Sequence, residues 1–527
     1  MLGLKYAFIG LFLLVSTVLS AQTESMYWVY FQDKNASISD FSDPFQLFSL
    51  KAIERKANQR TIIDAHDLPV HQPFVDGLLA EEVVGKSKWL NAALVRGIDS
   101  VYVASLPFVK RIDSHVPVKA VFAEDNGFSY GQSALQIEML NGDYLHDLGF
   151  TGQGVLIAVF DGGFNNAQNI AAFSHLWQGG GVKGIYSFVN QDTNIFFPGS
   201  HGTHVLSVLA AKNEGTFVGT APDADYWLFM TEDEVREVNA EEFNWLAAAE
   251  MSDSLGVDVI NSSLGYSTFD AGQTSYSLSD LDGQTSIVSQ AAQFAARKGM
   301  LVVNSAGNSG SDPLWRKILM PADADSILAV GSVGPTQDRS IFSSKGPTVD
   351  GRIKPDILAM GEQARYLTTG GFPTIGNGTS FATPMIAGLA ACLRQAYPNH
   401  STENIRQTIL QSADRFLTPD TLHGHGLPNF QFAFNDVVSV DELVDDFGVN
   451  IYPNPVDYSL TISWNEKFIP KQIAVFDIGG RKILNQVVSA GVSQIDIDVN
   501  HLPDGKYIIH IYNVDGAIVK TFNKHGN

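Results

Sequence analysis

The chain has 527 residues, of which 45% are apolar and 17% are charged, which is the composition of a folded protein with room for several domains. Lys and Arg number 34 against 56 Asp and Glu, so the formal net charge is −22. An acidic protein of this kind repels polyanions, and this argues against nucleic acid as a partner.

The first 21 residues have the features of a secretory signal peptide. Lys5 precedes an apolar run from Tyr6 to Leu19, and the small residues Ser20 and Ala21 follow it. Such a run is too short to span a membrane comfortably, and no other segment comes close. We therefore expect an exported protein, secreted or at the cell surface, whose mature chain has no transmembrane helix.

Residues 22–125 contain no catalytic motif and are expected to form a small domain. Their pattern is strand, helix, strand, strand, helix, strand, which is the order of a ferredoxin-like α+β domain. The segments assigned are strands at 27–31, 88–97 and 118–123 and helices at 50–60 and 105–112.

Residues 126–436 alternate buried strands with long helices. The runs VLIAVFD, YWLFM, VDVINSSL and MLVVNSAG are almost wholly apolar, as expected for parallel strands covered on both faces. The stretches AEEFNWLAAAEMSDSLG and SIVSQAAQFAARKG are helical and end on a glycine that can cap a helix. This alternation predicts an α/β fold with a doubly wound, mostly parallel sheet.

The composition changes after residue 436. The acidic stretch DELVDDFG marks a linker, placed at 437–447. Residues 448–527 contain the strand-like runs SLTISW, QIAVFD, SQIDIDV, YIIHIYN and AIVKTF, separated by turn residues. Short strands with turn signals predict a small all-β sandwich.

Three motifs in 126–436 indicate chemistry: VFDGGF, HGTH and GTSFATP supply Asp161, His201 and Ser380. A serine hydroxyl becomes a nucleophile when an imidazole takes its proton, and a carboxylate holds that imidazole in the right tautomer. The order Asp, His, Ser is one of three known for such triads. Pro384 is expected in the first turn of the helix that begins near Ser380, where a missing N–H has no cost.

These segments resemble those of subtilisin-like serine proteases, the subtilase family. The resemblance implies that Asp161 orients His201, that His201 is the general base and that Ser380 is the nucleophile. Asn308, in LVVNSAGNSG, matches the asparagine of the oxyanion hole. Gly162 stands where the family often has a hydroxyl residue, so one hydrogen bond to the carboxylate of Asp161 is expected to be missing.

The resemblance also suggests where a substrate binds. NSSLGY is similar to the family segment whose backbone pairs with a peptide as an added strand, which assigns that role to Ser263, Leu264 and Gly265. Ala306 and Gly307 would form the opposite wall of the pocket for the residue before the scissile bond. Neither wall carries a charge, and this favours an apolar or permissive preference there.

Both flanking domains carry resemblances of their own. WLNAALV followed by LPFVKRI resembles the inhibitory propeptide of the same family, so the chain's own propeptide is an expected inhibitor. YPNP, FDIGGR, LPDGKYIIHI and a final basic patch resemble the C-terminal sorting domain of type IX secretion cargo, which implies the secretion machinery as a partner. The alternatives are a small N-terminal domain of unrelated purpose and a carbohydrate- or protein-binding β-module.

No cofactor is expected to be needed for catalysis. His201 and His204 lie one turn apart, but no HExxH-type partner accompanies them for zinc, so His204 is expected to be a packing residue. LSDLDG offers Asp280 and Asp282 without the spacing of a calcium loop, which leaves structural calcium open and favours a solvated acidic loop. Cys392, the single cysteine, excludes an internal disulfide and is expected to be a buried core thiol.

The sequence thus predicts a secreted serine endopeptidase, made as a zymogen, that cleaves polypeptides through an acyl-enzyme. One alternative is a catalytically inactive, surface-displayed, protease-like binding protein, for which a broken triad would be expected. The other is an esterase with the same serine chemistry, although the G-x-S-x-G elbow of lipases is absent at Ser380.

Overall fold

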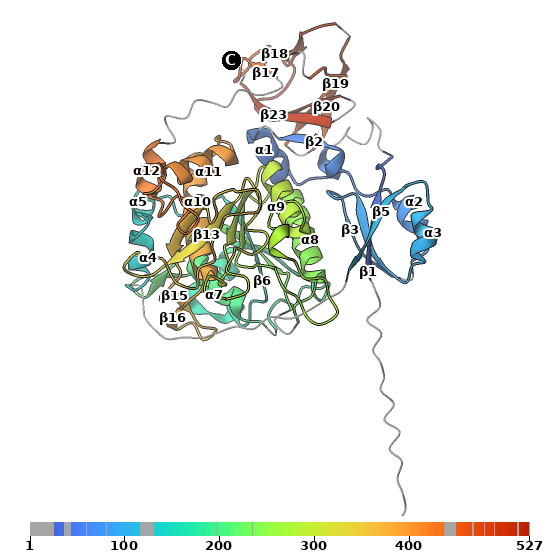
Figure 1. Cartoon of the computed structure of the whole chain (residues 1–527). Coiled ribbons are helices and arrows are strands. Elements are labelled where there is room, and N and C mark those ends of the chain that lie inside the picture. Colours follow the sequence, from blue (N-terminus) through green and yellow to red (C-terminus); the bar gives the residue numbers. More distant parts are fainter. Residues whose placement is uncertain are drawn as a thin grey trace, which may run out of the picture.

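The computed structural model of the chain describes residues 26–35, 44–59, 61–80, 82–115, 131–197, 199–233, 236–436, 449–465, 468–478, 480–489, 491–513 and 516–525. The predicted signal peptide, the strand predicted at 118–123 and the predicted linker lie outside these residues. Figure 1 shows a large α/β domain, a small α+β unit on its flank and a β-sandwich at one end.

Among the described residues, the large domain contains a seven-stranded sheet in the order β14-β13-β12-β11-β6-β10-β7. All its neighbouring strands are parallel. From β6 the chain first reaches the edge strand β7, returns to β10 beside β6, and then crosses to β11 on the other side and continues outward to β14, which confirms the predicted doubly wound fold. The strands are β6 (Leu156–Asp161), β7 (Val182–Ser187), β10 (Asp225–Met230), β11 (Val259–Ser262), β12 (Leu301–Ser305), β13 (Leu328–Val333) and β14 (Ile357–Met360).

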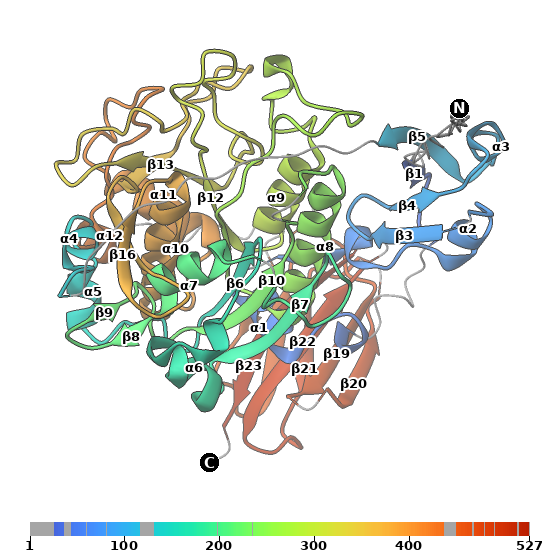
Figure 2. The same ribbon diagram turned by 90° about the horizontal axis from the view of Figure 1, so that it is seen from below.

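Helices cover both faces of this sheet (Figure 2). Ile157 and Val159 of β6 point to the face that α7 and α10 cover, whereas Ala158 and Phe160 point to the face that α8 and α9 cover. Such alternation is why the strand is apolar throughout. The longer helices are α7 (His201–Ala210), α8 (Ala240–Leu255), α9 (Ile287–Arg297), α10 (Thr379–Ala396) and α11 (Thr402–Gln411).

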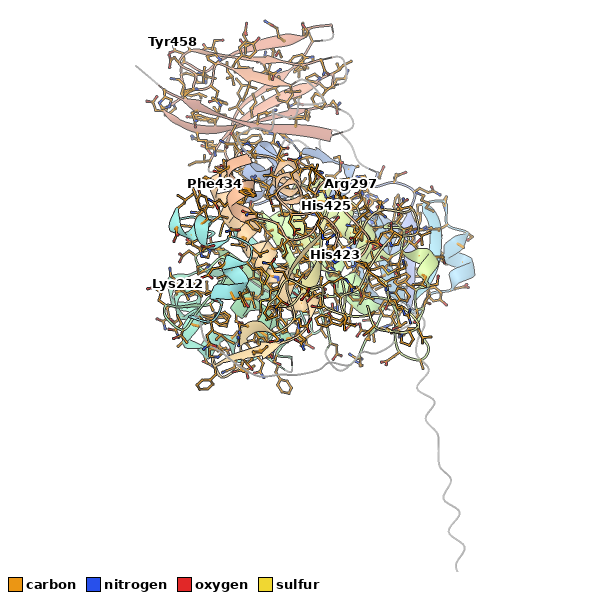
Figure 3. All side chains as sticks on the ribbon, turned by 60° about the vertical axis from the view of Figure 1, so that its left-hand side comes forward. Lys212, Arg297, His423, His425, Phe434 and Tyr458 are labelled. Atoms are coloured by element: carbon orange, nitrogen blue, oxygen red, sulfur yellow. The ribbon has the colours of Figure 1, made fainter. Side chains whose placement is uncertain are left out.

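Shorter elements complete the large domain. Phe434 of α12, labelled in Figure 3, packs against Tyr397 after α10, with ring centroids 5.3 Å apart. These elements are α4 (Ala134–Glu138), α5 (Asp143–Asp147), α6 (Ser174–Gly179), α12 (Phe430–Asp436), β8 (Lys212–Asn213), β9 (Phe217–Val218), β15 (Ala364–Leu367), β16 (Pro373–Gly376) and the 3-10 turns η4 (Ala167–Asn169), η5 (Ala171–Phe173) and η6 (Leu278–Asp280).

The small N-terminal unit has the ferredoxin-like fold, with sheet order β3-β4-β1-β5. Val75 of α2 and Val103 of α3 pack on one face of this sheet. Trp28 and Leu94 on the other face pack against the large domain around Phe243 of α8. The elements are β1 (Met26–Phe31), α2 (Gln72–Asp76), β3 (Glu82–Ser87), β4 (Ala92–Arg96), α3 (Ser100–Ala104) and β5 (Val109–His115).

Two predictions for this unit are wrong. The helix expected at 105–112 is a turn followed by the start of β5, because Pro107 interrupts the pattern and the helix α3 ends at Ala104. The helix expected at 50–60 exists as α1 (Leu50–Asn58), but it lies outside the ferredoxin-like unit. The unit's first helix is the short α2, which was not predicted from the sequence.

The C-terminal domain is a sandwich of two antiparallel sheets, which confirms the predicted fold. Its core includes Leu460, Ile462, Ile473, Ile509 and Ile511. Unexpectedly, β2 (Ile62–Asp64) from the N-terminal region forms an edge strand of the larger sheet, in the order β2-β23-β22-β19-β20. The domain's own strands are β17 (Asn450–Tyr452), β18 (Ser459–Ser463), β19 (Gln472–Asp477), β20 (Lys482–Val487), β21 (Gln494–Asp498), β22 (Gly505–Tyr512) and β23 (Gly516–Lys524).

Candidate active site

Asp161, His201 and Ser380 meet at the carboxyl end of the sheet and line one cavity of about 370 Å³. Asp161 is the last residue of β6, His201 is the first of α7, and Ser380 is the second of α10. Parallel strands end together at this edge, where α/β proteins bind their ligands. The structure therefore brings together all three residues that the motifs predicted.

The contact between Asp161 and His201 sets the state of the imidazole. His201 Nδ1 lies 2.7 Å from Asp161 Oδ1 and must be the donor, since a carboxylate only accepts. Nε2 is therefore the ring nitrogen that can accept a proton. Gly202 allows this approach, because a Cβ at that position would lie 2.6 Å from the carbonyl oxygen of Gly163 and 3.0 Å from Asp161 Cβ.

The two carboxylate oxygens of Asp161 have different surroundings. Oδ1 accepts a second hydrogen bond from the N–H of Gly162, at 2.8 Å. Oδ2 is buried and has no hydrogen-bond partner among the described residues. This agrees with the absence of a hydroxyl side chain at position 162.

Ser380 is hydrogen-bonded to the segment that follows β11. Its Oγ donates to the carbonyl oxygen of Ser263 over 3.2 Å, and Ser263 Oγ donates to the carbonyl oxygen of Ser380 over 2.9 Å. Pro384 explains why that carbonyl is available. It lies four residues after Ser380, in the second turn of α10 rather than the first as predicted, and its missing N–H leaves the Ser380 carbonyl without its helical partner.

Asn308 is oriented by Thr379, a residue to which the sequence analysis assigned no role. Asn308 Oδ1 accepts from Thr379 N–H at 2.9 Å and from Thr379 Oγ1 at 3.1 Å. Both acceptor contacts use the oxygen, so Nδ2 is the end of the amide that can donate to a ligand in the cavity. The Thr379 hydroxyl also accepts from Gly307 N–H at 3.2 Å, which fixes its proton toward Asn308.

Four of the five residues predicted to bind substrate line the cavity: Ser263, Leu264, Gly265 and Gly307. The fifth, Ala306, is fully buried and is not among the residues that line it. Leu264 is anchored through its carbonyl oxygen, which accepts from Ser305 Oγ at 2.9 Å and from Asn304 Nδ2 at 3.1 Å. These contacts fix the Leu264 carbonyl between Ser263 and Gly265, which also line the cavity.

A third segment, residues 232–241, brings charge to the cavity and was not singled out from the sequence. Its lining side chains are Glu232, Asp233, Arg236, Glu237 and Glu241. The signal that could have revealed it is the acidic string directly after the apolar strand DYWLFM.

Burial keeps several of these carboxyls protonated at pH values at which an exposed carboxyl would be ionised. It raises the pKa of Glu237 to about 7, of Glu232 to about 8 and of Glu241 to about 10. Glu232 accepts from the hydroxyl of Tyr266 at 2.5 Å. Arg236 pairs with Asp233 at 2.7 Å. The cavity therefore becomes more negative as the pH rises past 7.

The candidate metal-binding side chains have other contacts. His204 packs on the ring of Tyr366, with centroids 4.7 Å apart, and burial lowers its pKa to about 4. Asp282 accepts from the N–H groups of Gln284 and Thr285, each at 2.7 Å. Within the part of the chain that the structure describes, no group of three or more His, Cys, Asp or Glu is placed to hold a metal ion. The statement that catalysis needs no cofactor stays a prediction.

Comparison with known proteins identifies the class. Residues 152–432 match the model of the subtilase family, residues 26–127 match a peptidase S8 propeptide domain of Bacteroidota, and residues 450–524 match a secretion system C-terminal sorting domain. The chain belongs to the subtilase family. It is a serine peptidase precursor built for export, to the medium or to the cell surface.

Individual relatives are similar over much of their length. Subtilisin E of Bacillus subtilis (strain 168) is 31% identical over 329 residues, which are 62% of this chain and 77% of that protein. Subtilisin of Bacillus pumilus is 31% identical over 300 residues, 56% of this chain and 97% of its own. The crystal structure of MycP1 from the ESX-1 type VII secretion system has a TM-score of 0.46 at 23% identity, covering 63% of this chain and 90% of its own.

No helix among the described residues has the length and hydropathy to cross a bilayer.

Proposed function

We propose that this protein is a secreted serine endopeptidase, made as a zymogen, in which Asp161, His201 and Ser380 form the catalytic triad. The observation that carries the proposal is the 2.7 Å contact between Asp161 and His201, beside Ser380 and Asn308 in one cavity. A carboxylate, an imidazole, a hydroxyl and an amide donor are the groups that acyl transfer needs.

In the proposed reaction, His201 Nε2 takes the proton of Ser380 Oγ as that oxygen attacks the scissile carbonyl carbon. The negative charge that develops on the carbonyl oxygen is held by Asn308 Nδ2 and the N–H of Ser380, at the start of α10. His201 then protonates the leaving amine. A water molecule next attacks the carbonyl carbon of the acyl-enzyme while His201 takes its proton, and His201 returns that proton to Ser380 Oγ as the acid product leaves. A side-chain donor such as Asn308 contributes about 10²–10³ in kcat, a value that comes from subtilisin, a member of the same family.

Polypeptides are the proposed substrates. Ser263 and Gly265 would pair through their main chains with an extended peptide, so that affinity comes from backbone groups that all peptides share. The uncharged walls at Leu264 and Gly307 still favour an apolar or permissive side chain next to the scissile bond. The propeptide is the proposed inhibitor, and the C-terminal domain is the proposed signal that the secretion machinery recognises.

The test is the intact mass of the purified precursor followed over time, for the wild type beside Ser380→Ala. Ser279→Ala, at an exposed serine of the loop that holds η6, is the matched control. We expect the wild type and the control to lose about a hundred N-terminal residues, as the extent of the propeptide match implies, and Ser380→Ala to stay intact. If the wild type also stays intact, Ser380 does not act on its own chain, and the inactive, surface-displayed binding protein becomes the better description.

A further inference from the structure

Residues 44–68, here called the bridging segment, connect β1 to the helix α2 but pack away from the ferredoxin-like unit. They comprise η2 (Pro44–Gln46), α1, β2 and η3 (Ala65–Asp67). In Figure 1 the segment lies between the large domain and the C-terminal sandwich, with β2 against β23. The whole segment falls within the part of the chain that matches a propeptide domain.

The bridging segment completes the sheet of the C-terminal domain. β2 pairs antiparallel with β23, with Ile62 opposite Ile518, Ile63 opposite Ala517 and Asp64 opposite Gly516. Over residues 516–518, β23 is therefore an inner strand only while the segment is present. Without it, the N–H and C=O groups on that side of 516–518 would form an open edge, which is a template for strand addition.

The bridging segment also covers an apolar face of the same domain. The side chains with which it does so include Ile53 of α1 and Ile63 of β2, both fully buried. A salt bridge of 2.7 Å between Glu54 and Lys506 lies beside this contact. The covered side chains of the C-terminal domain are Ala474, Phe476, Ile508, Tyr512 and Val519.

On its other side, the bridging segment is bound to the large domain through buried salt bridges. Lys56 lies 2.9 Å from Asp253 of α8, Arg55 pairs with the same carboxylate, and none of the three side chains is more than 1% exposed. Lys298, after α9, pairs with Asp67 at 2.8 Å. The segment thus holds the C-terminal domain against the helices that also carry the ferredoxin-like unit.

The covered face contains buried polar groups without hydrogen-bond partners, which is expected of a contact that is later broken. His510 is fully buried, and both its ring nitrogens lack a hydrogen-bond partner among the described residues. Its cross-strand neighbours are Ala474 and Val519, both in the covered cluster, so it points to the same face. The hydroxyl of Tyr512 is buried without a partner as well. Such groups are costly in a permanent core but are satisfied by water once the cover leaves.

We propose that the bridging segment is a docking element for the C-terminal sorting domain, so that removal of the propeptide uncovers the edge of β23 and the apolar face beside it. The occupant of this surface in the precursor is the segment itself, bound as an added strand and a covering helix. Maturation of the peptidase and release of the sorting domain are then one event. The proposal rests on the proposed function in one respect, that residues 44–68 are removed with the propeptide.

The first experiment is hydrogen exchange on the uncleaved precursor carrying Ser380→Ala, which needs no protease activity. Ile63→Asp is added to break the docking, and Leu79→Asp, at a side chain that is 72% exposed, is the matched control. We expect the amides of 516–518, the part of β23 that pairs with β2, to exchange at least tenfold faster in Ile63→Asp, with β12 and β19 unchanged, and no change in Leu79→Asp. Equal exchange of 516–518 with and without Ile63→Asp would overturn the proposal.

If Ile63→Asp also raises exchange in β12, the milder Ile63→Ala replaces it and must give a smaller increase confined to β2 and β23. The second experiment follows the same amides in the wild type before and after propeptide loss. Faster exchange of 516–518 in the mature enzyme supports the coupling, and unchanged exchange refutes it. A wild type that never loses its propeptide contradicts the proposed function alone, because the first experiment still decides whether the segment docks.

Discussion

The two oxygens of Asp161 show how much of the site depends on single atoms. Oδ1 accepts from both His201 and Gly162, whereas Oδ2 is buried without a partner among the described residues. In the proposed triad, the imidazolium that forms in the reaction would be the countercharge of the whole carboxylate. The proposed function of Asp161 is therefore to hold a tautomer as much as to supply charge.

Asp161→Asn tests that function. The amide keeps the shape of the carboxylate, but its NH₂ group can turn to His201 Nδ1 and place the ring proton on Nε2, where it cannot accept from Ser380. We expect kcat to fall by about 10⁴, by analogy with the same change in another triad. Steady-state hydrolysis of a peptide substrate measures it, with circular dichroism to show an unchanged fold. A loss of less than tenfold would contradict the proposed role.

Thr379→Val tests how Asn308 is positioned. The change removes the hydroxyl that donates to Asn308 Oδ1 over 3.1 Å and leaves the backbone donor in place. We expect kcat to fall roughly tenfold with little change in KM, because an oxyanion donor acts mainly in the transition state. Thr408→Val, at a buried threonine of α11 whose hydroxyl has no hydrogen-bond partner among the described residues, is the matched control and should leave kcat within twofold. A change in KM alone would show that Thr379 serves substrate binding instead.

At the scale of elements, the segment 232–241 places several carboxyls in one buried region and makes stability depend on pH. The pKa of Glu232 is raised from 4.5 to about 8 in the folded protein. Unfolding therefore releases a proton between these values, and the free energy of unfolding must fall as the pH rises through that window. Its contribution is fully present below pH 4.5 and lost above pH 8.

Glu232→Gln should flatten this decline, because glutamine still accepts from the hydroxyl of Tyr266 but does not ionise. We expect the variant to gain on the order of a few kcal/mol relative to the wild type between pH 5 and pH 9. Urea unfolding across that range measures the difference. Two parallel curves would show that Glu232 does not titrate in this window.

The elements also show what the sequence could predict. Continuous apolar runs with glycine-capped helices identified the parallel sheet, and Asp161, His201 and Ser380 were found because each lies in a short local motif. Thr379 and Glu232 were missed because their importance depends on contacts with Asn308 and Tyr266, which are distant in sequence. The helix α1 was assigned to the wrong unit for the same reason, since its amphipathic pattern does not say which domain covers it.

At the scale of the whole molecule, buried salt bridges connect the propeptide region to the large domain. The mature enzyme would lack the propeptide partners of these salt bridges. Among the described residues, Asp253 pairs with Arg55, Lys56 and Lys88, all within the propeptide match. Burial alone would raise the pKa of Asp253, but Lys56 and Arg55 lower it below its usual range. This carboxylate therefore stabilises the precursor at neutral pH, and the stabilisation is lost as the pH falls below about 4.

Asp253→Ala should consequently destabilise the precursor far more than the mature enzyme. Removing the carboxylate leaves Arg55 and Lys56 buried without their partner, which costs about 3–5 kcal/mol in comparable buried pairs. Once the propeptide is removed as proposed, Arg55, Lys56 and Lys88 leave with it and Asp253 faces water, so the same change should cost less than about 1 kcal/mol. Urea unfolding of Ser380→Ala precursors with and without Asp253→Ala, beside the two mature enzymes, measures both values. An equal loss in precursor and mature forms would mean that Asp253 stabilises the large domain itself and not its contact with the propeptide.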